Sequence, residues 1–236
     1  MSYFIFNGID SREYGILEAV PMPPASRETV SEVDVEGRTK KPLIYTGVYE
    51  NMPIPCVLGL KSKERIREIY RWLSGTGNLI FSEENDKLYH VRSISLAPER
   101  LSVRFGKVNV EFTVEPFAYA VNPTGQVITQ DFEIIRNGGS IFAAPEIMLK
   151  PRSAGDISID VNGASFVIKV PSELVGKTVI VDCEVQVAYY LGDNNEKISI
   201  THMTYNDFPL LKTGENYIRY SGSASDVVCN VRERWL

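Results

Sequence analysis

The chain has 236 residues, of which 44% are hydrophobic and 23% are charged. These fractions are close to those of an average soluble globular protein and exclude a largely disordered chain. The formal net charge is −5, and Lys and Arg are spread along the sequence, so no basic patch for nucleic acid is expected. No apolar run reaches the roughly 20 residues that cross a bilayer, and the N-terminus lacks a signal-peptide pattern. We therefore expect synthesis and folding in the cytoplasm and no membrane partner.

A pair of long extended elements is expected between Glu28 and Pro55. Two strand-like segments, VSEVDVEG at 30–37 and PLIYTGVY at 42–49, flank the polar residues RTKK at 38–41. A strand, a polar turn and a second strand predict a long β-hairpin. The hairpin either stays within its own domain or reaches a neighbouring subunit, since covering strand edges is one route to assembly.

One segment has a helical period, from Ser62 to Gly75. Its apolar residues recur at i, i+3, i+4 and i+7, which predicts one amphipathic α-helix at about residues 62–75. Ser62 is the expected N-cap, and Gly75 is the expected stop. The expected buried stripe consists of Ile66, Ile69, Tyr70 and Leu73.

The rest of the chain shows the period of two that is typical of half-buried strands. Apolar residues alternate with polar ones over 108–115. Asn162-Gly163 joins two alternating runs and predicts a tight hairpin. We expect one long strand at 178–191, and a hairpin at 208–222 that turns near Gly214.

These elements predict a mainly all-β chain with two domains. Pro116, Pro123 and Gly125 lie between the first block of strands and the second, which places a boundary at 127/128. Residues 1–127 are expected to form a β-sandwich or barrel-like domain with the helix and the long hairpin. Residues 128–236 are expected to form a second β-sandwich.

Candidate catalytic side chains are few. His90 and His202, the only histidines, lie in strand-like patterns, where we expect each to have an ordinary hydrogen-bond partner. Asp182 and Glu184 share a face of the expected strand, as paired carboxylates in a glycosidase do, but a solvated strand face is the simpler interpretation.

The cysteines do not indicate a site either. Cys56, Cys183 and Cys229 are an odd number at wide spacing, which fits neither a disulfide framework nor a zinc motif, so we expect them in the core. The sequence therefore predicts that the protein is not an enzyme and has no catalytic residue, metal site or cofactor.

In their order along the chain, six segments resemble the distal tail proteins of phages with long non-contractile tails. The first half contributes FIFNGIDSREYGI (4–16), RTKKPLIYTGVYENMPI (38–54), IYRWLSGTGNLIFSEENDKLYHV (69–91) and VEFTVEPFAYAV (110–121). The second half contributes NGGSIFAAPEIML (137–149) and FPLLKTGENYIRYSG (208–222). The resemblance covers nearly the whole chain and rests on spacing and turn residues.

The resemblance implies a structural role at the tip of a virion tail. N-terminal domains of this family form a hexameric ring that joins the tail tube protein to the tail-tip hub protein. The C-terminal domain would be a galectin-like β-sandwich that projects outward, with a receptor-binding protein as a further partner. An inserted carbohydrate-binding module is not expected, because the second half is only as long as one sandwich and its only tryptophan is Trp235. A freestanding carbohydrate-binding or host-adhesion module stays open as the alternative, since fold does not determine function.

Overall fold

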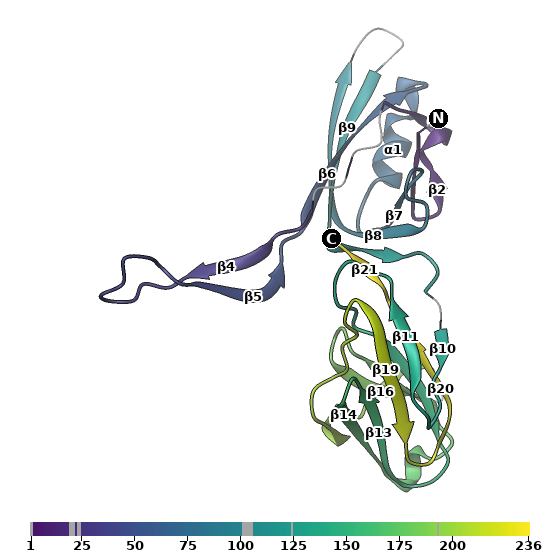
Figure 1. Cartoon of the computed structure of the whole chain (residues 1–236). Coiled ribbons are helices and arrows are strands. Elements are labelled where there is room, and N and C mark those ends of the chain that lie inside the picture. Colours follow the sequence, from purple (N-terminus) through teal and green to yellow (C-terminus); the bar gives the residue numbers. More distant parts are fainter. Residues whose placement is uncertain (1, 19–21, 23–24, 101–105, 124, 193) are drawn as a thin grey trace. The chain divides into compact units, whose positions relative to one another are not determined.

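The computed structural model describes residues 2–18, 22, 25–100, 106–123, 125–192 and 194–236. The chain divides into two compact units, the first formed by Met1–Val121 with Leu236 and the second by Asn122–Trp235. The fold is mainly β, with one α-helix among the described residues, as the sequence predicted (Figure 1). Strand β10 (Gly125–Val127) pairs with β20 (Ala224–Asn230) of the second unit, whereas the sequence-based boundary at 127/128 placed it in the first.

The first unit is built on an antiparallel sheet with the strand order β2-β1-β7-β8-β9-β6-β3. The predicted alternation determines its centre, because Ile54 and Phe112, which are paired between β6 and β9, are both buried, and so are Leu58 and Val108. The elements of this unit are β1 (Phe4–Phe6), β2 (Ile9–Asp10), β3 (Gly15–Leu17), β4 (Glu28–Glu32), β5 (Leu43–Tyr49), β6 (Met52–Leu60), α1 (Ile66–Trp72), β7 (Gly77–Phe81), β8 (Lys87–Arg100) and β9 (Gly106–Ala120).

Helix α1 is shorter than the sequence predicted. Ser62 accepts a hydrogen bond from the backbone N–H of Glu64 at 3.3 Å, but the turn that follows is a 3₁₀ turn over 63–65. The helix ends at Trp72, and Gly75 follows with a left-handed φ of 82°, which agrees with its expected role as a stop.

The buried face of α1 also differs from the expected stripe. Ile69, Trp72 and Leu73 are buried, whereas Ile66 and Tyr70 are only partly buried. The indole of Trp72 stacks on Phe4 at 5.5 Å and donates a hydrogen bond from Nε1 to the carbonyl of Phe6 at 3.1 Å. The large aromatic ring therefore anchors the helix to β1.

The second unit is a sandwich of two antiparallel sheets, with strand orders β10-β20-β12-β15-β16-β17 and β11-β19-β13-β14-β18. Side chains from both sheets form one apolar core, which includes Ile147, Val181, Ile159, Phe166 and Ile218. The remaining elements are β11 (Glu133–Asn137), β12 (Glu146–Pro151), β13 (Gly155–Val161), β14 (Ala164–Val170), β15 (Val179–Asp182), β16 (Val187–Leu191), β17 (Lys197–Ser199), β18 (Thr204–Tyr205), β19 (Gly214–Ser221) and β21 (Arg234–Trp235).

The Asn162-Gly163 hairpin between β13 and β14 is confirmed, with both residues at positive φ, 51° and 90°. The expected single strand at 178–191 is wrong. It is a hairpin of β15 and β16, in which the Asp182 carboxylate accepts the backbone N–H of Glu184 at 3.1 Å and Gln186 adopts a φ of 55°. An Asp side chain that binds the backbone two residues on favours a turn over a continuous strand.

The expected hairpin at 208–222 is also wrong. Gly214 begins β19, which pairs with β11 and β13, whereas Leu211 bridges to Ala143 elsewhere in the unit. The buried amide of Asn216 holds the intervening loop, because it accepts the N–H of Lys212 at 2.9 Å and donates to the carbonyl of Lys212 at 2.8 Å. A side chain therefore shapes this loop, and no hairpin turn is present.

Candidate assembly interface

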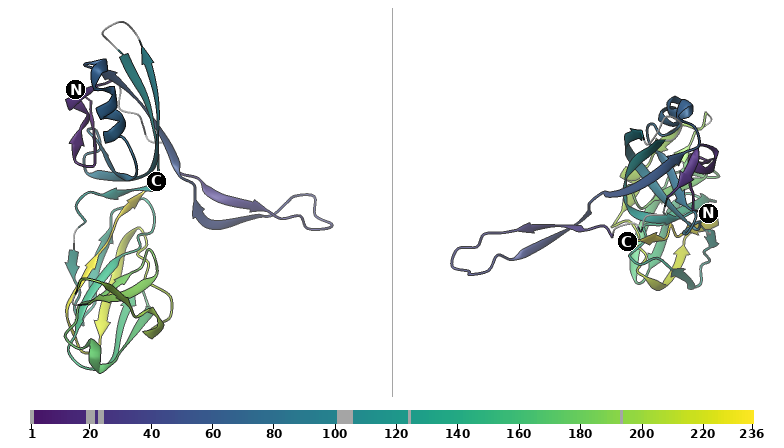
Figure 2. Two further views of the ribbon diagram at one scale, coloured as in Figure 1. Left: turned by 180° about the vertical axis from the view of Figure 1, so that it is seen from behind. Right: turned by 90° about the horizontal axis from the view of Figure 1, so that it is seen from above.

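The first unit carries a two-stranded ribbon, formed by residues 28–49, which we call the arm. Its strands β4 and β5 are antiparallel, with Glu28 opposite Tyr49 and Glu32 opposite Leu43. The register shifts after Glu28, and Gly47 adopts a left-handed φ of 73° near this bulge. The long hairpin that the sequence predicted is therefore confirmed (Figure 2), but its first strand ends at Glu32. Residues 33–37, which were expected in that strand, belong to the tip.

The tip of the arm is polar and is shaped by backbone hydrogen bonds. The N–H of Val33 donates to the carbonyl of Pro42, and the N–H of Arg38 donates to the carbonyl of Val35, both at 3.1 Å. Lys41 and Asp34 form an ion pair at 2.9 Å, but their side chains are 53% and 83% exposed. An ion pair this exposed adds little stability, so the tip depends on its turn geometry.

The arm is exposed along its length, including its apolar side chains. From Val30 to Val48 every residue except Pro42 is exposed. Leu43, Ile44, Tyr45 and Val48 are between 52% and 64% exposed. A two-stranded ribbon alone is at most marginally stable in water, and clustered exposed apolar side chains mark interaction surfaces. These features favour a partner that covers the arm.

Both faces of the arm carry apolar side chains. Val30 lies opposite Tyr45 and Glu32 opposite Leu43, so Val30, Leu43 and Tyr45 share one face. Ile44 lies opposite Ser31 and points to the other face. Because neither face is covered, the arm can contact a partner from either side.

The base of the arm is attached firmly to the sheet of its own unit. The ring of Tyr49 contacts Phe117 of β9, with 5.1 Å between the ring centroids. The N–H of Glu50 donates to the carbonyl of Arg27 at 3.0 Å, and the hydroxyl of Ser26 donates to the carbonyl of Glu50 at 2.8 Å. Strand β6 then begins at the buried Met52, so the arm continues directly into a central strand.

The candidate catalytic residues do not come together. His90 lies in β8, where its Nδ1 is 3.0 Å from the Asn78 side-chain oxygen, as expected. His202 lies in an exposed 3₁₀ turn, so its expected place in a strand is wrong, because the chain turns at 201–203.

The three cysteines are buried and free, as expected for core residues. Burial raises the pKa of the Cys56 and Cys229 thiols to about 12 and also raises the pKa of Cys183. Thiols with such a pKa carry almost no thiolate at neutral pH and are poor nucleophiles.

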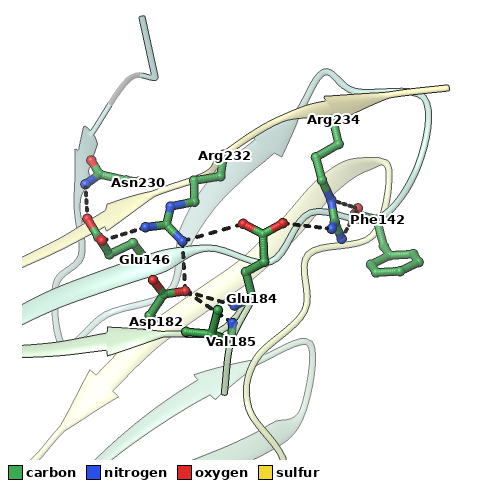
Figure 3. Close-up of polar contacts among 8 residues, drawn as sticks. All are labelled: Phe142, Glu146, Asp182, Glu184, Val185, Asn230, Arg232 and Arg234. Carbon is green, nitrogen blue, oxygen red and sulfur yellow. Dashed lines mark hydrogen bonds and ion pairs between the residues drawn. The ribbon is translucent and has the colours of Figure 1, made fainter. Parts of the chain in front are cut away.

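Asp182 and Glu184 do not form the solvated strand face that the sequence indicated. Both carboxylates form ion pairs with the guanidinium of Arg232, at 2.8 Å for Asp182 and 3.8 Å for Glu184 (Figure 3). Arg232 also pairs with Glu146 at 2.6 Å. Burial alone would lower the pKa of Arg232, but its hydrogen bond to Asp182 and the three nearby carboxylates raise it above the ordinary value. The cluster is an ion-pair network, and neither of its arginines, Arg232 and Arg234, was predicted from the sequence.

Arg234 extends this network. Its guanidinium lies 3.5 Å from Glu184 and donates two hydrogen bonds to the carbonyl of Phe142, at 3.0 and 3.2 Å. It also lies over the Phe142 ring, 4.7 Å from the centroid. The alternating Arg232-Glu233-Arg234 near the C-terminus was the available sequence signal, but the carboxylates come from distant segments.

No group of three or more His, Cys, Asp or Glu side chains suited to a metal ion occurs among the described residues. In the same part of the chain, no helix has the length and apolar character needed to cross a membrane.

No protein-family model matches the chain, and no curated protein matches it either. Among solved structures, the chain is similar to the SPP1 Dit (gp 19.1) protein, described as a paradigm of the hub adsorption apparatus in phages that infect Gram-positive bacteria. The two chains share 14% identity and a TM-score of 0.77, and the match covers 100% of each. The phage P2 baseplate in its activated conformation with Ca matches at 9% identity and a TM-score of 0.49, over 98% of this chain and 97% of that chain. The expected resemblance to distal tail proteins is thus confirmed at the level of the fold.

Proposed function

We propose that this chain is a distal tail protein of a long-tailed phage and that its first unit forms a hexameric ring. In the ring, the arm of each subunit lies against the next subunit. The ring joins the tail tube protein to the tail-tip hub protein at the end of the virion tail, after synthesis in the host cytoplasm. The role is structural and not enzymatic.

The single observation that carries this proposal is the arm. It leaves apolar side chains on both faces exposed, yet its base continues directly into the central strand β6. A contact between different surfaces of neighbouring subunits closes into a ring when the rotation between them closes. The fold shared with the SPP1 Dit protein over the whole of both chains supports this assignment.

We propose that the second unit is a galectin-like sandwich that stays outside the ring contact. Its exposed face is then available to a receptor-binding protein. Because the ring contact belongs to the first unit, the second unit is expected to be monomeric by itself.

The register of the arm makes a precise deletion possible. Glu28 lies opposite Tyr49, so residues 29–48 can be removed and the ribbon closed at its base with Asn-Gly, a sequence suited to a two-residue turn. The full chain should form hexamers at high concentration or with tube protein, measured by light scattering. The deletion variant should remain monomeric, with an unchanged melting temperature.

A finer variant separates the apolar contact from the presence of the arm. Leu43→Ser with Tyr45→Ser should also prevent the hexamer. Val185→Ser is the matched control, because Val185 is 65% exposed and Tyr45 is 64% exposed, but Val185 lies in the second unit. Hexamers that form equally well without the arm would exclude it as the ring contact. A chain that stays monomeric under every condition, tube protein included, would exclude the ring.

A further inference from the structure

The second unit contains a groove of about 530 Å³ that the proposed ring does not use. Its walls come from segments far apart in the sequence, namely residues 127–130, Arg152, Tyr220 and residues 224–227. Backbone hydrogen bonds join these segments, with Ile128 donating to Val227 at 2.9 Å and Tyr220 donating to Thr129 at 3.1 Å. The groove is therefore a built feature of the sandwich.

The groove contains one cationic and one anionic side chain that do not neutralise each other. The guanidinium of Arg152 has no hydrogen bond or ion pair with any described residue. The carboxylate of Asp226 accepts one hydrogen bond, from the Ser225 hydroxyl at 3.3 Å, and no described cation pairs with it. By contrast, Arg219 and Arg232 of the same unit each pair with a carboxylate.

The backbone presents Asp226 in an unusual conformation. Strand β20 bulges against β12, where the register shifts between Met148 and Lys150, and Asp226 adopts a φ of 53° within the bulge. Bulges re-aim side chains and are frequent beside binding sites, and a non-glycine residue at positive φ is uncommon. The bulge thus places a carboxylate at the groove.

The groove also has a small apolar surface. The hydroxyl of Tyr220 donates to the carbonyl of Ala224 at 3.3 Å, which fixes the ring at the wall. Val127 also lines the groove and is 68% exposed. At the polar end, the side-chain N–H of Gln130 donates to the carbonyl of Gly222 at 3.3 Å, and its amide oxygen remains an acceptor.

From these contacts we propose that the groove binds a neutral saccharide. Sugar hydroxyls both donate and accept, so adjacent hydroxyls can accept from Arg152 and donate to Asp226 at the same time. The C–H face of a sugar ring suits the apolar surface of Tyr220 and Val127. Asp226 disfavours an anion, Arg152 disfavours a cation, and an apolar ligand would leave both charges desolvated.

The test uses the full chain on an array of neutral bacterial and animal glycans, followed by calorimetric titration of the strongest free oligosaccharide. Arg152→Gln and Asp226→Asn each remove one charge and keep a polar side chain, and Asn also tolerates positive φ. Each should weaken binding at least about tenfold, because each removes a charge-assisted hydrogen bond. Arg136→Gln and Asp207→Asn are matched controls at exposed positions that do not line the groove, and they should bind like the parent chain.

Both groove variants should melt at the temperature of the parent chain, since the side chains they change are exposed. A chain that binds no glycan on the array would overturn the proposal. So would full affinity in both groove variants, or an equal loss in the two controls. Binding of short peptides that depends on Arg152 and Asp226, with no glycan binding, would assign the groove to a peptide instead.

Discussion

Replacing Arg232 by alanine should destabilise the second unit substantially, because its single guanidinium neutralises three neighbouring carboxylates. Arg232 lies 2.6 Å from Glu146 and 2.8 Å from Asp182. The side chains of Glu146, Asp182 and Glu184 are 22%, 16% and 34% exposed, so water would solvate them only in part after the change. Arg232→Ala therefore leaves three acidic groups close together without their shared cation.

The expected loss lies between the values for exposed and buried ion pairs. Breaking a fully buried pair costs about 3 to 5 kcal/mol, and an exposed pair is worth about 0 to 1 kcal/mol. Some partners remain, since Asn230 donates to Glu146 at 3.3 Å and Glu184 keeps Arg234 at 3.5 Å. We therefore expect a loss of about 2 kcal/mol in the free energy of unfolding, which lowers the melting temperature of the second unit by roughly 5 to 10 °C.

Scanning calorimetry of the full chain measures this change, with Arg136→Ala as the control at an exposed arginine. A second variant tests the cause. Adding Glu146→Gln and Asp182→Asn to Arg232→Ala removes two of the stranded charges, while Asn keeps the oxygen that accepts the Glu184 N–H. This triple variant should regain most of the lost stability. A single variant as stable as the control, or a triple variant no better than the single, would refute the electrostatic explanation.

Three further predictions concern the helix, an ion pair and the unit boundary. Ile69 is fully buried, so Ile69→Ala should cost about 2 to 5 kcal/mol in urea unfolding, whereas the exposed Arg67→Ala should cost less than about 0.5 kcal/mol. Burial alone would raise the pKa of Asp160, but hydrogen bonds from Ser165, Arg219 and Ser158 hold that pKa below its ordinary value. Its stabilisation is therefore present above about pH 4 and lost as the pH falls through the lower folded pKa, so the stability gap to Asp160→Asn should close in acid. A fragment of residues 122–236 should fold alone and melt higher than residues 130–236, which lacks β10 and the buried Ile128.

Each of these predictions has an outcome that contradicts it. Equal small losses for the two helix variants would mean that α1 does not anchor the first unit. A stability difference between the parent chain and Asp160→Asn that stays constant from pH 7 to pH 2 would show that the lowered pKa of Asp160 does not contribute to stability. Equal melting of the two fragments would show that β10 adds nothing to the sandwich, and aggregation of both would favour one continuous core.

The features predicted correctly from the sequence are those that short-range patterns determine. The arm follows from two strand-like segments around a polar turn, and in the described part of the chain its two strands pair only with each other. Asn162-Gly163 forms its hairpin because both residues tolerate positive φ. The missed Trp72 also had a local signal, since it lies three residues after Ile69 and belongs to the same helical face.

The wrong predictions come from turns that side chains create. The valines of 179–187 keep a period of two, yet Val185 is 65% exposed, because Asp182 and Gln186 turn the chain between them. No glycine or proline marks this turn, so the period alone favoured a strand. At Gly214 the error was the opposite one, because a turn was expected and a strand was found. Gly214 has a positive φ, but it begins β19, whose partner β11 lies elsewhere in the sequence.

Neither the groove nor the Arg232 network could be predicted from local sequence patterns, because the residues of each come from distant segments of the chain. Arg152 and Asp226 share the groove only because the sandwich brings the end of β12 beside the bulge in β20. In the sequence each is a single charged residue in a polar stretch, with no spacing that links it to the other. The second half has Trp235 as its only tryptophan, which disfavoured a sugar site, but a tryptophan platform is only one type of contact surface. A bulge that leaves a carboxylate and a guanidinium unpaired in one groove is a different route to the same chemistry, and it becomes visible only when the register of β12 and β20 is known.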